Sequence, residues 1–244
     1  MINMQNAKGV KMFEGHSDVS QLEKTLMSRL PAKEIRKWIQ KYSTPYRELM
    51  SYYKCAMMEV CTKFNVLDEE LSLRYDRNPI ESIKSRLKTP ESILDKLQRR
   101  GLYPSVENIE ENVFDVAGVR VICSYVSDIY MLADALEKQD DIVIVRKKDY
   151  IKEPKENGYR SLHLITEIPI FLHDRKRMMK VEVQLRTISM DWWASLEHKI
   201  CYKKDFIVTD EMRQELRECA EIGARLDARM ETLQERANLL TDGK

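Results

Sequence analysis

Runs that favour β-strands alternate with helix signals through the middle of this chain, and this alternation restricts the fold more than any other feature. The runs predicted to be strands are residues 80–88, 115–125, 141–147, 161–171 and 179–188. Between them, residues 89–100 open with the capping sequence Thr89-Pro90-Glu91, and residues 127–139 form a second helical segment. Strands mixed with helices in this order predict an α/β or α+β core of about five strands.

Helix signals dominate on both sides of this core. The upstream helices are predicted over residues 20–30, 31–42 and 44–73, after a frayed tail over residues 1–16. The downstream helices are predicted over residues 189–200 and 209–240. We therefore predict three parts: an N-terminal helical region (1–76), a core (77–204) and a C-terminal helix (205–244).

The last predicted helix carries apolar residues at alternating spacings of four and three. This stripe consists of Met212, Leu216, Cys219, Gly223, Leu226, Met230, Leu233, Ala237 and Leu240. A heptad pattern this long needs a long partner. We favour a contact between subunits, and packing on its own domain stays open as the alternative.

Composition narrows the class of protein. The formal net charge is +1, so bulk charge does not indicate binding to DNA, and any polyanion site must come from local clustering. The five cysteines are scattered without a Cys-x-x-Cys pair, which predicts free thiols in a cytoplasmic protein. No apolar run is long enough to span a bilayer, so we expect no membrane association.

A first basic cluster lies at the start of the core. Arg86 and Lys88 are two residues apart on a predicted strand and share a face, while Ser92, Lys96 and Arg99 share a face of the following helix. The helix N-terminus adds backbone N–H donors and a positive dipole end. Together these groups form a candidate triphosphate site. The alternative is a solvated amphipathic helix that follows an exposed strand.

A second basic cluster occupies residues 146–160. Lys148 and Lys155 belong to it, and the Asn157-Gly158 turn places Tyr159 where an aromatic face can stack on a base. The alternative is a hairpin turn with a half-buried tyrosine.

Two acidic residues accompany these clusters. Asp115 leads an apolar strand, and Glu182 lies within VEVQLRT, where it projects on the same side as Gln184 and Arg186. An acid in such a strand is costly unless it is paired or bound to a metal ion. A Mg²⁺ site built from one or two carboxylates and substrate phosphates satisfies this need. A salt bridge from Glu182 to Arg186 or Arg120 is the alternative.

Five motifs make the chain recognisable. They are the Arg86-x-Lys88 element, DVAGVRVIC (115–123), NGYRSLH (157–163), VEVQLRT (181–187) and WASLEHK (193–199). Over residues 78–204 the chain resembles the RelA/SpoT-like synthetases, and among them the stand-alone small alarmone synthetases of the RelQ type. The resemblance implies a nucleotidyltransferase-like mixed sheet flanked by helices, with helical extensions at both ends. It also implies a homotetramer that transfers pyrophosphate from ATP to the 3′-hydroxyl of GDP or GTP, giving ppGpp or pppGpp.

The same resemblance implies a role for each motif residue. For ATP, the implied adenine contacts are Arg86 and Arg120, and the phosphate contacts are Lys88, Ser92, Lys96 and Arg99. For GDP or GTP, the implied contacts are Tyr159 at guanine, Lys148 and Lys155 at the phosphates, and Asn157 in the same loop. Asp115 and Glu182 are implied at the catalytic Mg²⁺, with Gln184 and His163 beside the reacting groups. We take Glu182 as the candidate proton acceptor for the 3′-hydroxyl.

Regulation and two competing functions complete the expectations. RelQ-type enzymes are activated by pppGpp in a cleft between subunits, where this chain carries Ser82, Lys84 and Asp191. A negative Asp191 facing a polyphosphate predicts weak or absent activation. The competing functions are a catalytically inactive regulator that binds guanine nucleotides or RNA, and a nucleotidyltransferase that releases pyrophosphate. RNA binding is possible but no feature of the sequence indicates it.

Overall fold

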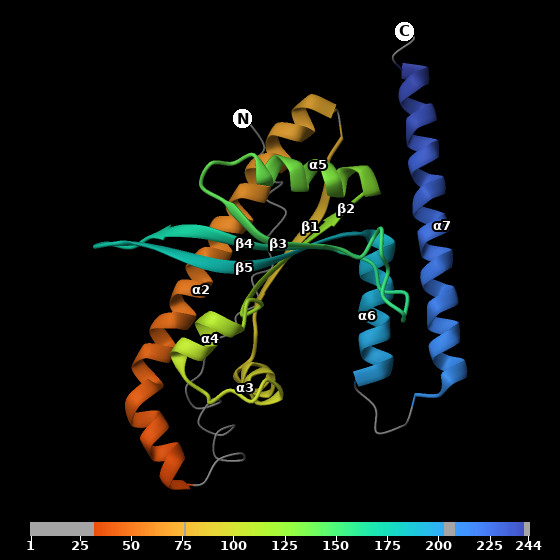
Figure 1. Ribbon diagram of the computed structural model, residues 1–244. Helices are drawn as coiled ribbons and strands as arrows, with labels where there is room; N and C mark the ends of the chain where they lie inside the picture. Colours follow the sequence, from red (N-terminus) through yellow and green to blue (C-terminus); the bar gives the residue numbers. More distant parts are fainter. Residues whose placement is uncertain (1–31, 76, 203–207, 242–244) are drawn as a thin grey trace, which may run out of the picture. The chain divides into compact units, whose positions relative to one another are not determined.

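A computed structural model describes residues 32–75, 77–202 and 208–241 of the chain (Figure 1). The tail predicted over residues 1–16 and the helix predicted over 20–30 lie outside the described residues. In chain order the elements are α2 (Ala32–Tyr75), β1 (Ile80–Leu87), α3 (Pro90–Arg99), α4 (Val106–Asn112), β2 (Ala117–Cys123), α5 (Val126–Glu137), β3 (Val143–Asp149), β4 (Leu162–Phe171), β5 (Lys176–Thr187), α6 (Ile188–Tyr202) and α7 (Asp210–Thr241).

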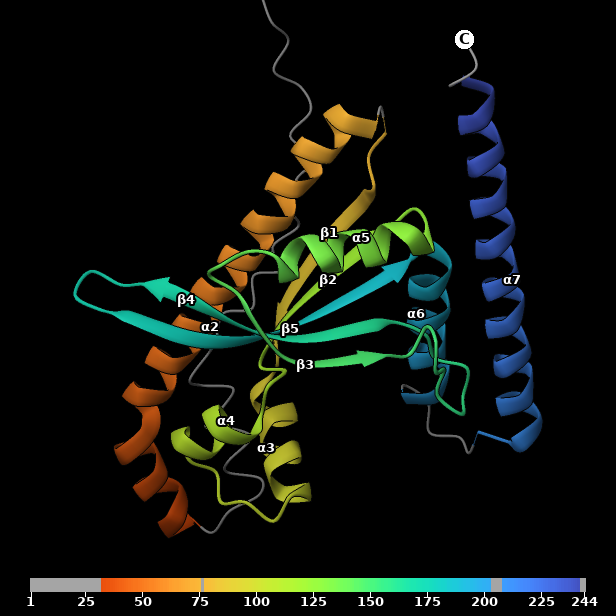
Figure 2. The ribbon, with the colours of Figure 1, turned by 45° about the horizontal axis from the view of Figure 1, so that its top comes forward.

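The strands form one five-stranded sheet in the order β1-β2-β5-β4-β3. Strand β1 is antiparallel to β2, because Lys88 N donates to Val116 O at one end of the pair and Ser124 N donates to Pro79 O at the other. Strand β4 runs opposite to both β3 and β5, and a tight turn joins it to β5 (Figure 2). The predicted α+β class with a mixed sheet of about five strands and flanking helices is confirmed.

Helix α2 differs from the sequence expectation. It is a single helix of 44 residues with Pro45 inside it, so the break predicted before Thr44-Pro45 is wrong. An internal proline costs about 3 kcal/mol, because it removes one backbone hydrogen bond and crowds the preceding turn. Just after Pro45 the helix buries four large side chains, Tyr46, Leu49, Met50 and Tyr53. Each contributes about 1.5–3 kcal/mol on burial, which together outweighs the cost of the proline.

The chain divides into two compact units. Among the described residues, the first unit contains 32–62, 83–119 and 167–182, and the second contains the described parts of 63–82, 120–166 and 183–241. The first unit holds Arg86, Lys88, Ser92, Lys96, Arg99, Asp115 and Glu182. The second unit holds Arg120, Lys148, Lys155, Asn157, Tyr159, His163 and Gln184. Each predicted basic cluster therefore lies inside one unit.

Two short helices pack within the first unit. Helix α3 begins at Pro90 after Thr89, whose side chain accepts a hydrogen bond from Ser92 N, as the capping sequence predicts. Its inner face buries Ile93, Leu94 and Leu97. Helix α4, which the sequence patterns did not predict, is capped by Ser105. Because the apolar face of α3 is buried, its opposite, polar face carries the residues predicted to contact phosphates.

Helices α6 and α7 lie side by side in the second unit (Figures 1 and 2). Trp193 Nε1 on α6 donates to Leu216 O on α7, and the hydroxyl groups of Thr187 and Ser189 donate to Asp227. The apolar stripe predicted on α7 is partly covered near its start. Further along it is open, with Leu226, Met230 and Leu233 exposed.

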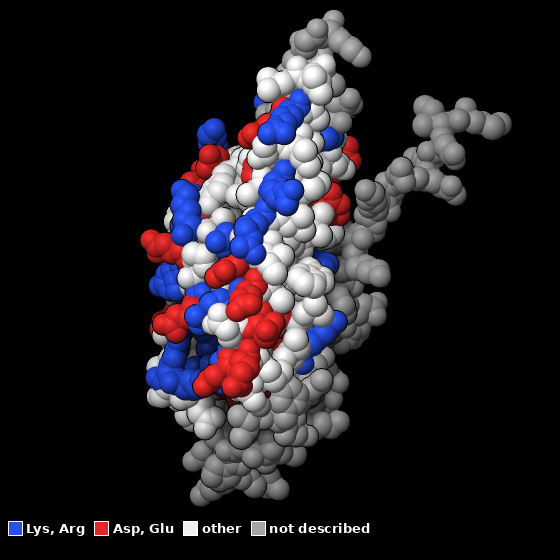
Figure 3. Space-filling model, turned by 90° about the vertical axis from the view of Figure 1, so that its right-hand side faces the viewer, with Lys and Arg blue, Asp and Glu red and all other residues white. Residues whose placement is uncertain are grey.

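The exposed face of α7 mixes basic, acidic and uncharged side chains and has no extended patch of one sign (Figure 3). Within the part of the chain that the structure describes, none of the helices combines the length and apolar character that a bilayer crossing requires.

Candidate active site

The first cluster is built around the carboxylate of Asp115. Lys88 Nζ lies 3.0 Å from one carboxylate oxygen and Lys96 Nζ lies 2.9 Å from the other. Lys88 directly follows β1, Lys96 lies on α3, and Asp115 precedes β2, so three segments of the first unit converge here. The structure thus brings together three residues that the sequence analysis singled out, Lys88, Lys96 and Asp115, through ion pairs that it did not predict.

The two lysines determine the ionisation of this carboxylate. Burial of Asp115 raises the pKa of its carboxyl, but the hydrogen bonds and charges of Lys96 and Lys88 outweigh burial, so the pKa lies below its ordinary value. Asp115 is therefore ionised at neutral pH. The site presents one fixed negative charge and two ammonium groups within hydrogen-bonding distance.

The other predicted phosphate contacts lie on the same strand and helix. Ser92 is half-buried in the first turn of α3, where its hydroxyl accepts a hydrogen bond from Thr89 Oγ1 at 3.0 Å. Arg86 is exposed on β1 and Arg99 is exposed in the last turn of α3. Arg99 Nε donates to Asp95 O at 3.3 Å, which holds this guanidinium against its own helix.

The second cluster is centred on Tyr159. Its hydroxyl accepts a hydrogen bond from Arg186 at 2.6 Å and lies 2.8 Å from His163 Nε2. Since the oxygen already accepts from the guanidinium, its own proton is available to His163. The rings of Tyr150 and His163 meet the Tyr159 ring edge-on, at centroid distances of 6.0 and 5.8 Å. Tyr159 is thus held at its hydroxyl and along its ring edges.

The segment before Tyr159 contains the other residues predicted to contact GDP or GTP. Lys155 Nζ lies 4.7 Å from the ring centroids of both Tyr150 and Tyr159, close enough for cation–π attraction. Asn157 Oδ1 accepts from Tyr159 N at 3.1 Å, so this side chain shapes the turn. Lys148 is exposed near the end of β3.

Gly158 allows the loop to approach α7. Its φ is +88°, a conformation that L side chains rarely adopt, and a Cβ at this position would lie 2.6 Å from the Cβ of Ala220. Asn157 also donates to Glu197 of α6 at 3.3 Å. The segment that carries Tyr159 is therefore seated against both C-terminal helices.

Arg186 and Asp191 are structural partners that the motifs alone did not identify. Asp191 Oδ1 accepts from Arg120 at 3.0 Å and from Arg186 at 3.2 Å, and Asp191 is only 7% exposed. Gln184 Oε1 accepts from Arg186 NH2 at 3.1 Å, which confirms that Gln184 and Arg186 project on one side of β5. The expectation that Asp191 presents an uncompensated charge to a polyphosphate is wrong, because two guanidinium groups neutralise it. Weak or absent activation by pppGpp stays a prediction, which rests on Ser82 because the family resemblance implies an aromatic stacking face at that position.

The acidic residues considered as metal ligands are Asp115 and Glu182. No group of three or more His, Cys, Asp or Glu side chains with metal-binding geometry occurs among the residues that the structure describes. Asp115 is ionised, and each of its oxygens already faces a cation, while Glu182 is half-buried on β5 in the same unit. Carboxylate oxygens are ligands that Mg²⁺ accepts, and it needs only one or two of them when phosphate oxygens and water complete its shell.

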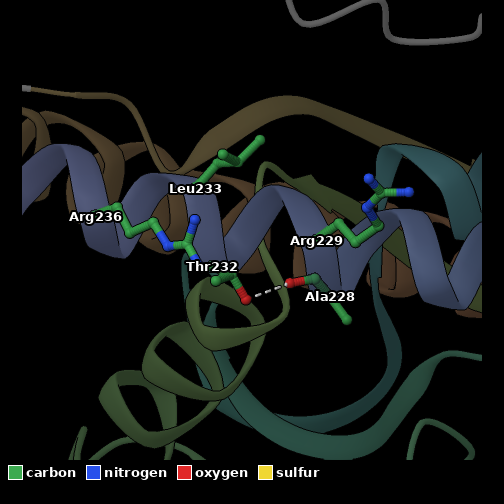
Figure 4. A pocket seen from close by; sticks show the side chains of 5 residues that line it. All are labelled: Ala228, Arg229, Thr232, Leu233 and Arg236. Carbon is green, nitrogen blue, oxygen red and sulfur yellow. Dashed lines mark hydrogen bonds between the residues drawn. The ribbon is translucent and has the colours of Figure 1, made fainter.

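A surface pocket of about 410 Å³ lies along α7. Its described lining consists of Ala228, Arg229, Thr232, Leu233 and Arg236, all on α7 (Figure 4). Thr232 is held by a hydrogen bond to Ala228 O at 3.0 Å. The pocket holds none of the predicted site residues, so we do not place the chemistry there.

The described features are a mixed five-stranded sheet, a carboxylate bound by two lysines and a tyrosine held at its hydroxyl, and comparison with known proteins shows which family carries them. The family model for the region found in RelA and SpoT proteins matches residues 85–206. GTP pyrophosphokinase YwaC of Bacillus subtilis (strain 168) is 49% identical over 178 residues, which are 73% of this chain and 85% of that protein. The chain belongs to the RelA/SpoT family, which confirms the resemblance.

Solved structures agree with this assignment. The crystal structure of small alarmone synthetase 2 from Bacillus subtilis has a TM-score of 0.72 and 45% sequence identity, covering 78% of this chain and 98% of that one. Small alarmone synthetase 1 from Bacillus subtilis, bound to its product pppGpp, also has a TM-score of 0.72, with 31% identity over 79% of this chain and 97% of that one. The fold and the family are therefore both established.

Proposed function

We propose that this chain is a GTP pyrophosphokinase, which transfers the pyrophosphate group of ATP to the 3′-hydroxyl of GDP or GTP. The products are AMP and ppGpp or pppGpp. The observation that carries the proposal is the carboxylate of Asp115 held between Lys88 and Lys96, at 3.0 and 2.9 Å. Pyrophosphoryl transfer depends on positioning the reacting groups and on neutralising the charge of the phosphates. The cluster offers two ammonium groups for this, Lys88 just before α3 and Lys96 on it, and one carboxylate that can hold a cation.

The first unit binds the phosphates of ATP in this proposal. Lys88 and Lys96 exchange part of their contact with Asp115 for phosphate oxygens, and Ser92 and the first-turn amides of α3 add neutral donors. Arg86 and Arg99 are exposed and reach bound nucleotide by side-chain rotation. Arg120 is assigned to the adenine base.

Mg²⁺ is the proposed cofactor, with Asp115 and Glu182 as its protein ligands. When bound, the ion neutralises negative charge on the transferred phosphates. Asp115 suits this role because its pKa is already below the ordinary value, so metal binding displaces no proton from it. Glu182 is the proposed acceptor of the proton that leaves the 3′-hydroxyl.

The second unit binds the acceptor nucleotide. Tyr159 stacks on guanine, and Lys155, which lies over its ring at 4.7 Å, moves to the acceptor phosphates together with Lys148. Asn157 holds the loop in shape, and His163 holds the tyrosine hydroxyl. Gln184, bonded to Arg186, lies beside the reacting groups in this assignment.

Assembly and location belong to the same proposal. We infer a homotetramer, supported by the apolar stripe of α7, whose Leu226, Met230 and Leu233 expose 54%, 47% and 55% of their surface in the single chain. The cysteines at 55, 61, 123, 201 and 219 are free thiols, which agrees with action in the cytoplasm.

The experiment is an assay of nucleotide products. Purified protein is incubated with ATP, GDP and Mg²⁺, and the products are separated by anion-exchange chromatography. We expect AMP and ppGpp in equal amounts, and no AMP when GDP is omitted. Free pyrophosphate in place of AMP would indicate nucleotidyl transfer, and binding of both nucleotides without any product would indicate an inactive regulator.

A further inference from the structure

The carboxylate of Asp191 joins Arg120, which the proposed function assigns to the adenine base, to Arg186, which contacts Tyr159 at the proposed guanine site. Asp191 lies on α6, Arg120 on β2 and Arg186 on β5, all within the second unit. One oxygen, Oδ1, accepts from NH1 of Arg120 at 3.0 Å and from NH1 of Arg186 at 3.2 Å. A single atom therefore fixes the relative positions of both guanidinium groups.

Arg186 carries this constraint on to the guanine site. Its NH2 group donates to the hydroxyl of Tyr159 at 2.6 Å, and its guanidinium carbon lies 5.1 Å from the centroid of the Tyr159 ring. Arg186 is 4% exposed, so its side chain has little freedom to take another position. The orientation of the tyrosine ring is thus coupled to the position of Arg186.

Gln184 provides a second bridge between the same two arginines. Its Oε1 accepts from NH2 of Arg186 at 3.1 Å and from Nε of Arg120 at 3.4 Å. The Gln184 bridge is neutral and its contact with Arg120 is long, whereas the Asp191 bridge carries a full charge. Asp191 is therefore the stronger of the two links.

The arrangement is costly for a purely structural feature. Arg186 Nε is buried and has no hydrogen-bond partner among the described residues, and one carboxylate faces two guanidinium groups. A buried donor without a partner disfavours folding. Such costs are concentrated at sites where side-chain position matters for function.

We propose that Asp191 is a positioning residue shared by the two nucleotide sites. It holds Arg120 in place for the adenine base, and through Arg186 it holds Tyr159 in place for the guanine base. This proposal rests on the proposed function for the roles of Arg120 and Tyr159. Asp191 touches neither nucleotide, so it acts on binding through the two arginines.

The first test compares Asp191→Asn with a control on the same helix. Asparagine keeps the shape of the side chain and its Oδ1 acceptor but removes the charge, so both contacts lose the charge assistance of the carboxylate. We expect the KM values for ATP and for GDP each to rise by about tenfold, the scale of a lost charge-assisted hydrogen bond. Trp193→Phe removes the 2.7 Å bond from α6 to Leu216 O without touching either arginine. At a similar loss of thermal stability, this control should leave both KM values unchanged.

A double-mutant cycle tests the path through Arg186. Arg186→Gln should raise the KM for GDP in the unmodified background but add little in Tyr159→Phe, because the hydroxyl through which Arg186 acts is already absent. Asp191→Asn should still raise the KM for ATP in Tyr159→Phe, since Arg120 does not depend on that hydroxyl. Additive effects of Arg186→Gln and Tyr159→Phe on GDP would contradict the relay.

Failure of this proposal is distinct from failure of the proposed function. If the unmodified protein forms no AMP with GDP, the proposed function is wrong, and equilibrium titration of Asp191→Asn with ATP and with GDP still tests the positioning role. Weakened affinity for both nucleotides supports it. Affinity unchanged for either nucleotide, with stability lowered as in Trp193→Phe, would show that Asp191 is only a structural ion-pair partner.

Discussion

Lys96 Nζ lies 2.9 Å from Asp115 Oδ1, which ties α3 to the segment before β2 at the place where the phosphates of ATP are proposed to bind. Lys88 engages the other oxygen, so the carboxylate is ionised and shielded by two cations. Asp115 therefore holds both lysines in position before substrate binds. It also means that a change at Asp115 disturbs charge balance more than packing.

Asp115→Asn is expected to abolish synthesis with little effect on secondary structure. Loss of the charge removes several kcal/mol of transition-state stabilisation, which corresponds to about a thousandfold fall in turnover. Product formation is measured at saturating Mg²⁺, with circular dichroism as the check on folding. Glu110→Gln is the matched control, because Glu110 pairs with Arg177 at 2.6 Å outside the cluster, and it should retain activity. Near-normal turnover in Asp115→Asn would remove Asp115 from the metal site.

Gly158→Ala is expected to destabilise the protein and to weaken GDP binding. A positive φ costs an alanine about 1–2 kcal/mol, and the contact with Ala220 adds about 1–3 kcal/mol of overpacking. Gly101→Ala isolates the first effect, because Gly101 also has a positive φ, +68°, but a Cβ there meets nothing within 4 Å. Urea unfolding of both variants measures the difference.

A compensating substitution tests whether the close contact with Ala220 causes the loss of stability in Gly158→Ala. Ala220→Gly in the Gly158→Ala background should recover the overpacking cost and part of the GDP affinity. If Gly158→Ala is no more destabilising than Gly101→Ala, the loop does not depend on its seat against α7.

The buried carboxyl of Asp227 should make the stability of the folded protein depend on pH. Burial raises the pKa of its carboxyl, helped by Glu231, and this outweighs the hydrogen bonds from Ser189 and Thr187 and the charge of Arg160. The folded state therefore holds the proton more tightly than the unfolded state, whose pKa is about 4. Stability is then lost as pH rises from about 4 through the raised folded value.

Asp227→Asn removes this titration while its amide oxygen still accepts the two hydroxyl hydrogen bonds. The free energy of unfolding of the variant relative to the unmodified protein should thus be greater at pH 7 than at pH 4. Urea titrations of both proteins at the two pH values measure it. A difference that is constant or that shrinks with rising pH would show that the pKa of the Asp227 carboxyl is not raised in the folded state.

Leu226→Glu is expected to dissociate the proposed tetramer. A charge in the middle of the apolar stripe is costly to bury between subunits. Light scattering should give four times the 28.9 kDa chain mass for the unmodified protein and a smaller species for the variant. Arg225→Glu, on an exposed position beside the stripe, is the control and should stay assembled. A monomeric unmodified protein would exclude the tetramer.

The sequence patterns predicted the strands and α3 because these depend on local alternation and capping. They placed Lys88 and Lys96 in one basic cluster, but they did not predict that both pair with Asp115, which lies 27 and 19 residues away. The continuity of α2 was not predictable in the same way, because the burial of Tyr46 and its neighbours decides it against the local signal of Pro45. Helix α4 is short, and no strong periodicity marks it.

Asp191 shows most clearly what could not be predicted from the sequence. The family resemblance suggested that its charge faces a polyphosphate, but its carboxylate pairs with two arginines that lie 71 and 5 residues away in the sequence, and only the packed fold brings them together. The same holds for the seat of Gly158 against Ala220. Long-range pairing of polar side chains leaves no periodic trace in a single sequence.

The most direct test of the central claim follows the β-phosphate of ATP. The protein is incubated with Mg²⁺, GDP and ATP labelled at the β-phosphate, and the labelled products are resolved by chromatography. The account predicts that all transferred label appears in ppGpp while unlabelled AMP accumulates in equal amount, and that Asp115→Asn transfers none. Label released as free pyrophosphate, or label retained in ATP while both nucleotides bind, would contradict it.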